Sequence, residues 1–192
     1  MNTEMLNALK EKAHKTAVEH GFYEEVKPDA FSLGLVMSEA GEAINADRKG
    51  KHADTKGFKE IEAAEKDFPF AENFKAHIKD TVEDEIADIV IRLLDFAGLK
   101  RYGLYYERNY RLTNRVFRIL EHEGLSSALF QLNSALGEAY NIDRLEEGVS
   151  WSIMIYSECF CKMTRSDKDL WWFVEQKMRY NDLRPRLNGK KY

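Results

Sequence analysis

Cysteine, proline and long apolar runs are all scarce in this chain of 192 residues. Its only cysteines, Cys159 and Cys161, are separated by one residue, a spacing that fits neither a zinc site nor a disulfide framework. No apolar stretch approaches the roughly 18 residues that suggest a membrane span. The start, Met1-Asn2-Thr3-Glu4, leads into a charged stretch and lacks the apolar core of a signal peptide. We therefore expect a cytoplasmic protein with no membrane partner.

An excess of positive charge is also lacking, because 33 acidic residues outnumber 29 basic ones and give a formal net charge of −4. General nucleic-acid binders are usually basic, so we expect no nucleic-acid partner. Hydrophobic residues nevertheless make up 44% of the chain, which is enough to bury a sizeable core. We expect a single domain over residues 1–192.

Helical patterns fill most of the sequence between the three prolines. No convincing alternation of apolar and polar residues predicts a β-strand, so the expected fold is all-α and resembles a helical bundle. Gly21, Gly50 and Gly124 lie where helices are expected to stop. Ser166 or Asp167 is the expected N-cap of the last helix. The expected helices span about residues 3–20, 29–49, 73–100, 105–122, 125–147, 150–164 and 168–183, with a connecting excursion over 50–72 that holds a short helix near 58–66.

Two pairs of carboxylates lie far apart in the sequence but share one spacing. Glu39 and Glu42 are three residues apart, and so are Glu85 and Asp88. Residues with this spacing lie on the same face of a helix. Both pairs sit among apolar residues, where a carboxylate is costly to bury unless a cation meets it. If the two helices pack face to face, the four carboxylates converge, and Mg²⁺ is the expected counter-ion, with Mn²⁺ as the alternative.

A pattern of 16 residues recurs at a constant offset of 96 residues. Residues 33–48 read LGLVMSEAGEAINADR, and residues 129–144 read LFQLNSALGEAYNIDR. Convergence of two amphipathic helices explains the apolar matches, but it does not easily explain the shared order of Ser, Gly, Glu, Asn, Asp and Arg. We predict an internal duplication, with a first repeat over about 25–100 and a degenerate second repeat over about 120–185.

The two copies differ in their acidic residues. Glu138 corresponds to Glu42, but Ala135 stands where the first copy has Glu39. The pair Glu85 and Asp88 has no obvious counterpart in the second half of the chain. The sequence therefore predicts one functional carboxylate cluster, supplied by the first copy, and leaves open whether the second copy helps to shape the site.

A third group of polar residues lies near the end of the chain. Lys177, Asn181 and Arg184 fall at positions i, i+4 and i+7, which is one face of a helix. They are suited to grip phosphates, with the arginine as a fork and the lysine as a point charge. The alternative is a basic helix end that only satisfies its own dipole.

Together these motifs resemble the all-α NTP pyrophosphohydrolases, the superfamily of MazG and the dimeric dUTPases. The resemblance rests on Glu39-x-x-Glu42, on Glu85-x-x-Asp88 and on the tail. The tail, Lys177-x3-Asn181-x2-Arg184 followed by Asn188-Gly189-Lys190, is similar to the ending of MazG-like domains. The resemblance covers about residues 30–190. It implies Mg²⁺-dependent hydrolysis of a nucleoside or deoxynucleoside triphosphate to the monophosphate and pyrophosphate.

The resemblance also suggests roles for the residues of the three motifs. Glu39, Glu42, Glu85 and Asp88 are the expected metal ligands, and Glu39 is the expected catalytic base. Lys177, Asn181 and Arg184 are expected to bind the substrate.

Several further points stay open at this stage. A nucleobase could stack on one of several large aromatic side chains, although such residues are more often part of a core. The alternative function is a non-catalytic helical binding or scaffold protein with a structural cation site. The base and sugar preference and the formation of a homodimer also stay open. The aromatic candidates are Phe31, Tyr140, Trp151, Trp171 and Trp172.

Overall fold

The structure is a computed structural model that describes residues 1–64, 68–107, 109–164 and 166–189. These residues form nine α-helices and one short 3-10 helix, with no β-strand among them, which confirms the expected all-α fold. Within this part of the chain, no helix combines the length and the apolar character needed to cross a bilayer. Lys190, part of the predicted basic ending, lies outside the described residues, as does the side chain of Asn188.

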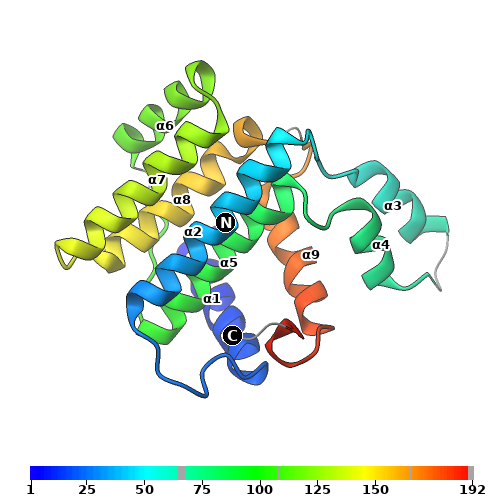
Figure 1. Ribbon diagram of the computed structural model, residues 1–192, viewed down its shortest axis with the longest axis horizontal. Coiled ribbons are helices and arrows are strands. Elements are labelled where there is room, and N and C mark those ends of the chain that lie inside the picture. Colours follow the sequence, from blue (N-terminus) through cyan, green and yellow to red (C-terminus); the bar gives the residue numbers. More distant parts are fainter. Residues whose placement is uncertain (65–67, 108, 165, 190–192) are drawn as a thin grey trace.

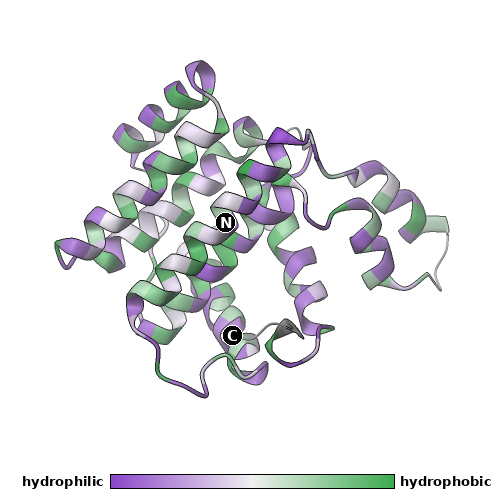
Figure 2. Ribbon diagram, in the orientation of Figure 1, coloured by the Kyte–Doolittle hydropathy of each residue, from purple (hydrophilic) through white to green (hydrophobic). Residues whose placement is uncertain are grey.

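Helix α5 lies at the centre of the molecule and contacts α1, α2, α8 and α9. Figure 1 shows α2 along α5, a second group formed by α6, α7 and α8 beside them, and α3 and α4 projecting at one end. Most helices carry both hydrophobic and hydrophilic residues, seen as green and purple turns in Figure 2. The elements are α1 (Thr3–Glu19), α2 (Asp29–Arg48), α3 (Thr55–Ala64), α4 (Phe70–His77), α5 (Val82–Lys100), α6 (Tyr110–His122), α7 (Leu125–Asn141), α8 (Leu145–Met163), α9 (Leu170–Asp182) and η1 (Arg186–Gly189).

The predicted helices agree with α1, α2 and α9 to within two residues at each end. The three expected stop signals are confirmed as well, because Gly21, Gly50 and Gly124 all have a positive φ next to a helix end. A positive φ is readily adopted by glycine because it has no Cβ. The predicted N-cap of the last helix is wrong, since Asp169 caps α9 by accepting a hydrogen bond from the backbone N–H of Trp172.

The prediction of one helix over 73–100 is wrong, because two helices, α4 and α5, occupy this range. Asp80 adopts a left-handed conformation with φ 57°, which interrupts the helix. Thr81 then starts α5: its hydroxyl accepts a hydrogen bond from the N–H of Asp84 and donates one to the carbonyl of Ile78. The break sets where the acidic first turn of α5 begins.

The predicted boundaries in the second half of the chain also shift. The expected helix over 125–147 ends at Asn141, because Asp143 is left-handed with φ 54°, and α8 begins at Leu145 instead of residue 150. The helix expected from residue 105 begins at Tyr110, where the Asn109 side chain caps it. Sequence periodicity does not mark these positions, since a single left-handed residue leaves the apolar pattern almost unchanged.

A single cluster of buried side chains extends from Leu6 in α1 to Tyr180 in α9. Aromatic contacts attach the α3–α4 excursion to it. The ring of Phe74 stacks on Tyr180 with centroids 4.5 Å apart, and the ring of Phe58 meets Trp172 edge-on at 5.7 Å. These contacts hold α9 in place beside the first turn of α5.

The two similar segments lie in helices that contact each other. Residues 33–48 lie within α2, and residues 129–144 cover most of α7 and the turn that follows it. The corresponding residues Gly41 and Gly137 line one groove between these helices. The duplication itself stays a prediction.

Candidate functional site

The first turns of α5 are unusually acidic for a buried segment. Glu83, Asp84 and Glu85 are all buried, and Asp88 follows one turn later. The helix N-terminus favours negative charge, because its free N–H groups and the helix dipole are positive there. Glu83 also accepts a hydrogen bond from the backbone N–H of Ala53 and contacts His52, so it links the first turn of α5 to the loop that follows α2.

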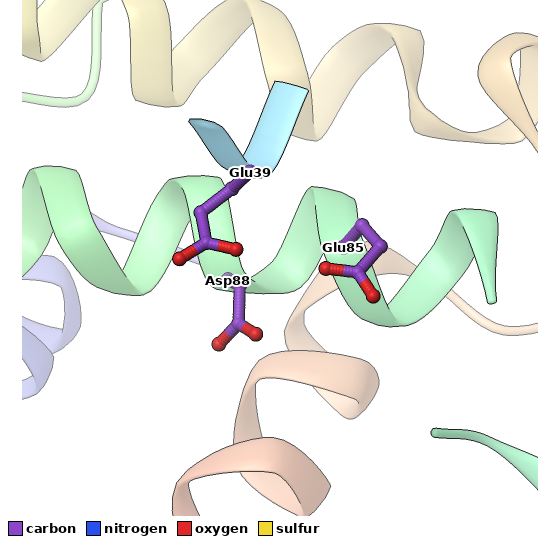
Figure 3. Close-up of side chains that lie close together, drawn as sticks. All are labelled: Glu39, Glu85 and Asp88. Atoms are coloured by element: carbon purple, nitrogen blue, oxygen red, sulfur yellow. The ribbon is translucent and has the colours of Figure 1, made fainter. Parts of the chain in front are cut away.

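Three of the four predicted metal ligands come together. Glu39 projects from α2, while Glu85 and Asp88 project from α5, and one carboxylate oxygen of each lies within 4.8 Å of the others. Figure 3 shows the three side chains close together, with Glu39 reaching over α5 from a cut-away piece of α2. We call Glu39, Glu85 and Asp88 the carboxylate group.

The fourth predicted ligand, Glu42, lies outside the carboxylate group. Its side chain is exposed on α2, about one turn beyond Glu39. Its charge still acts on the group, because it helps to raise the pKa of both Glu39 and Glu85. The structure therefore places Glu42 at the rim of the site.

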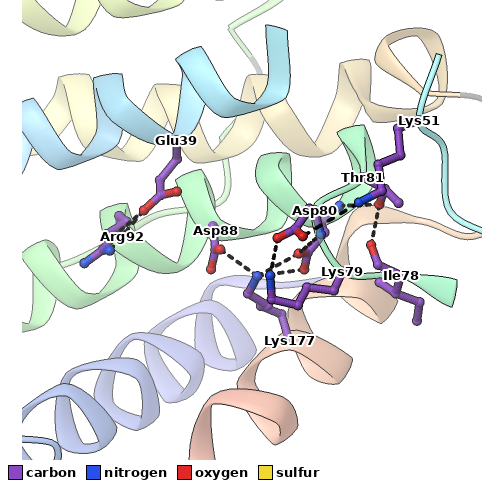
Figure 4. A network of polar contacts seen from close by, with 10 residues as sticks. Glu39, Lys51, Ile78, Lys79, Asp80, Thr81, Asp88, Arg92 and Lys177 are labelled. Atoms are coloured by element: carbon purple, nitrogen blue, oxygen red, sulfur yellow. Dashed lines mark hydrogen bonds and ion pairs between the residues drawn. The ribbon is translucent and has the colours of Figure 1, made fainter. Parts of the chain in front are cut away.

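Each member of the carboxylate group has a different environment. Both Nε and a terminal nitrogen of Arg92 contact Oε1 of Glu39, at 3.1 and 3.0 Å, which leaves Oε2 for another partner. Asp88 is 2.7 Å from the ammonium of Lys177. Figure 4 shows both contacts. Glu85, only 4% exposed, receives no side-chain hydrogen bond or ion pair from any described residue.

The electrostatics follow from this crowding of negative charge. Burial, with the charges of Asp84 and Asp88, raises the pKa of Glu85 to about 8. Burial and the charge of Asp88 also raise the pKa of Glu39, and the nearby Arg92 only partly opposes the shift. A cation placed among these oxygens would oppose both shifts, because a nearby positive charge favours the deprotonated carboxylates. The carboxylate group is therefore able to hold a metal ion.

Lys177, predicted to grip phosphate, is buried inside this network. Only 4% exposed, it donates to both oxygens of Asp84 at 2.8 Å and contacts Asp88. Its ammonium is also 5.8 Å from the centre of the Phe74 ring. The side chain thus faces two carboxylates and does not line the cleft described next.

The other two residues of the predicted phosphate-binding face, Asn181 and Arg184, line a cleft together with Glu39 and Asp88. The cleft lies among α1, α2, α5 and the end of α9 and contains about 680 Å³ of space, part of it open to solvent. The side-chain oxygen of Asn181 is buried and has no hydrogen-bond partner within the described part of the chain. A buried polar atom without a partner is uncommon and suits a site that binds a ligand.

A second, more aromatic cleft adjoins the first one. It is lined by Tyr23 and Phe31 among others, and it shares Phe22, Arg92 and Asp95 with the first cleft. Asp95 contacts a ring nitrogen of His14 at 2.9 Å and receives a hydrogen bond from Tyr23.

Of the five aromatic candidates, only Phe31 lies at either of these two clefts. The other four pack elsewhere. Trp171 donates to Ser157, and Trp172 packs against Phe58 and Phe173. Trp151 contacts Arg144, and Tyr140 lies by the loop that joins α7 to α8.

Sequence reasoning missed Asp84, Arg92 and Asp95. A signal for them exists, because Asp84, Asp88 and Arg92 are spaced by four residues and Asp95 follows three residues later, all on one face of α5. A charged face on a helix that is otherwise apolar would have pointed to them.

Comparison with protein-family models, with curated proteins and with solved structures returns no match for this chain.

Proposed function

We propose that this protein is a Mg²⁺-dependent nucleoside triphosphate pyrophosphohydrolase that releases a nucleoside monophosphate and pyrophosphate. The observation that carries the proposal is the carboxylate group, at a cleft that also presents Asn181 and Arg184; within it, Glu85 is buried with no side-chain hydrogen bond or ion pair from a described residue. Acidic oxygens and an arginine that line one cleft suit a substrate that is anionic and binds metal.

Glu39, Glu85 and Asp88 would hold the metal ion. All three offer carboxylate oxygens, which Mg²⁺ and Mn²⁺ prefer, and such a cation would give Glu85 the partner that the described part of the chain does not supply. When bound, the ion neutralises phosphate oxygens and lowers the pKa of a water molecule. Mn²⁺ is the alternative ion for the same donors.

The remaining residues of the cleft would position substrate and water. Arg92 fixes one oxygen of Glu39, so that the other can orient or deprotonate the attacking water. Arg184 would contact the phosphates as a fork, and Asn181 would use its unpartnered oxygen for the bound nucleotide or its hydration shell. Glu42, at the rim, would stabilise the bound cation through its charge.

The aromatic cleft is the natural place for the base. Tyr23 and Phe31 supply ring surfaces, and the cleft joins the phosphate-binding side at Arg92 and Asp95. Flat apolar rings favour a nucleobase through stacking, independent of its identity. This arrangement supports a nucleoside triphosphate over inorganic polyphosphate.

The test is a panel of ribonucleoside and deoxyribonucleoside triphosphates with Mg²⁺, scored separately for pyrophosphate and orthophosphate. We expect pyrophosphate from at least one nucleotide, and we expect Glu85→Gln to reduce its release by roughly 100-fold or more, because loss of a ligand should exceed the effect of losing an outer-shell partner. Glu138→Gln, the same change on the exposed face of α7, is the matched control.

The products decide between the alternatives. Release of orthophosphate alone would mean that the protein cleaves a different phosphoanhydride bond, and it would overturn the pyrophosphohydrolase proposal. Binding of Mg²⁺ without hydrolysis of any nucleotide would instead favour the non-catalytic scaffold with a structural cation. Full activity in a folded Glu85→Gln variant would remove the carboxylate group from the mechanism.

A further inference from the structure

We propose that the ammonium of Lys177 occupies the place of a second divalent cation, so that the site binds one metal ion where its carboxylates could hold two. This inference rests on the proposed function, because it concerns the same metal site. Lys177 is then a positioning residue that acts through Asp84 and Asp88, and it does not contact the phosphates directly.

The first observation is that the acidic residues form two adjacent groups. Beside Glu39, Glu85 and Asp88, a second set formed by Asp80, Asp84 and Glu85 also brings one carboxylate oxygen from each residue to within 4.8 Å of the others. Glu85 belongs to both sets. A carboxylate shared between two neighbouring sets of oxygens is the arrangement expected where two divalent ions lie about 3.5–4 Å apart.

The second observation is the position of Lys177 in this arrangement. Its Nζ is 2.8 Å from both oxygens of Asp84 and 2.7 Å from Asp88, so one ammonium bridges the two sets. Figure 4 shows Lys177 rising from α9 towards Asp88 on α5. An ammonium that uses its donors on three carboxylate oxygens is satisfied and has none left for a phosphate.

The third observation is that Lys177 is held there by packing. Its neighbour one turn later on the same helix, Tyr180, stacks on Phe74, and the Phe74 ring also faces the ammonium. With 4% exposure, the side chain has little room to turn outwards. Asp80, the exposed member of the second set, also pairs with Lys51 and Lys79, so the second set is already neutralised at its outer edge. At its inner edge, Lys177 carries one positive charge where a divalent ion carries two, so it leaves part of the negative charge for the ion held by Glu39, Glu85 and Asp88.

The experiment counts the bound metal directly. Mn²⁺ binding to the full chain without nucleotide is measured by the electron paramagnetic resonance signal of free Mn²⁺, for wild type and for Lys177→Met. We expect one site in wild type and two in Lys177→Met, with the second site lost again when Asp84→Asn is added. Lys10→Met is the matched control, because Lys10 is also buried at 7% exposure but donates to the carbonyl of Tyr102 and pairs with Glu11, away from the carboxylate group. It should keep one site.

Each outcome bears on a different claim. Equal counts in wild type and Lys177→Met would overturn this inference while leaving the metal site of the proposed function in place. No binding in wild type would overturn both. Lys177→Met is expected to lose stability in the presence of a chelator and to regain it with Mn²⁺, which thermal unfolding measures. A variant that fails to fold at every Mn²⁺ concentration would show that a divalent ion cannot replace the ammonium, and the inference would be wrong.

Discussion

Glu42 and Glu138 allow the two copies of the repeated pattern to be compared one residue at a time. Both are exposed glutamates at corresponding positions, but only Glu42 lies near the carboxylate group. We expect Glu42→Gln to lower kcat/KM roughly tenfold, as for loss of an outer-shell partner, and Glu138→Gln to leave it close to wild type. Steady-state kinetics with Mg²⁺ measure both. Equal losses would mean that the second copy supplies part of a site.

At the residue scale, the sequence predicts which acids come together better than it predicts their partners. The three-residue spacing identified Glu39, Glu85 and Asp88, because a helix places such pairs on one face. The same spacing rule could not show that Lys177 pairs with Asp84, since the two residues are 93 positions apart. Nor could it show that Glu42 lies at the rim, because that depends on how α2 is rotated against α5.

The start of α5 is the element on which the carboxylate group depends. We expect Thr81→Ala to lower the free energy of unfolding by about 1–2 kcal/mol, as for other lost N-caps, and to weaken Mn²⁺ binding because the first turn of α5 loosens. Asn109→Ala is the control, because it removes the N-cap of α6, a helix that packs mainly on α7 and α8. It should lower the free energy of unfolding by a similar amount and leave the Mn²⁺ affinity unchanged. Unfolding in urea and Mn²⁺ titration together test this, and unchanged affinity in a destabilised Thr81→Ala variant would contradict it.

The end of α9 carries a second prediction at this scale. Arg184→Ala should lower kcat/KM by roughly tenfold or more, because hydrogen bonds to a charged group contribute about 1.5–3 kcal/mol. Arg184→Lys should restore activity only in part, since lysine keeps the charge but loses the fork. A fall in kcat at unchanged KM would identify a contact made only in the transition state.

Arg179→Ala is the control for this prediction. Arg179 lies on the same helix but pairs with Glu62 and covers the ring of Phe70, away from the cleft. Its loss should leave kinetics unchanged. If Arg184→Ala has the kinetics of wild type, the basic residues at the end of α9 only satisfy the helix dipole, and the scaffold alternative is strengthened.

Helix existence was predictable at the element scale, whereas helix breaks were not. Apolar periodicity and the glycines at positive φ defined α1 and α2 closely. The breaks at Asp80 and Asp143 depend on aspartates in the left-handed conformation. Aspartate tolerates this conformation, but an aspartate in a sequence does not by itself predict it. Because the Asp80 break sets the first residue of α5, it also decides the depth at which the acidic turn is buried.

For the whole molecule, the burial of so many acids predicts a stability that depends on pH. In metal-free protein, Glu85 titrates at about 8 in the fold and near 4.5 when unfolded. Between these values the unfolded chain has lost a proton that the folded chain retains, so the free energy of unfolding falls as pH rises. Glu39 and Asp84 shift in the same direction. We expect a loss on the order of 2–4 kcal/mol between pH 5 and 8.

Urea unfolding at several pH values, with a chelator present, measures this loss. Glu85→Gln should flatten the dependence, because glutamine does not titrate. Mg²⁺ should reverse part of it, since a metal ion binds the deprotonated carboxylates and stabilises the fold at higher pH. A free energy of unfolding that rises steadily from pH 5 to 8 in the metal-free protein would contradict the burial of an unpartnered Glu85.

The contact between Asp84 and Lys177 also sets an order of events during synthesis. At about 5–20 residues per second, a ribosome needs roughly 5–20 s to pass from one residue to the other, which lie 93 positions apart. Throughout that interval the buried partner of Asp84 has not yet been made, so this carboxylate must stay hydrated. The docking of α9 against the acidic turn of α5 is therefore a late step in folding on the ribosome.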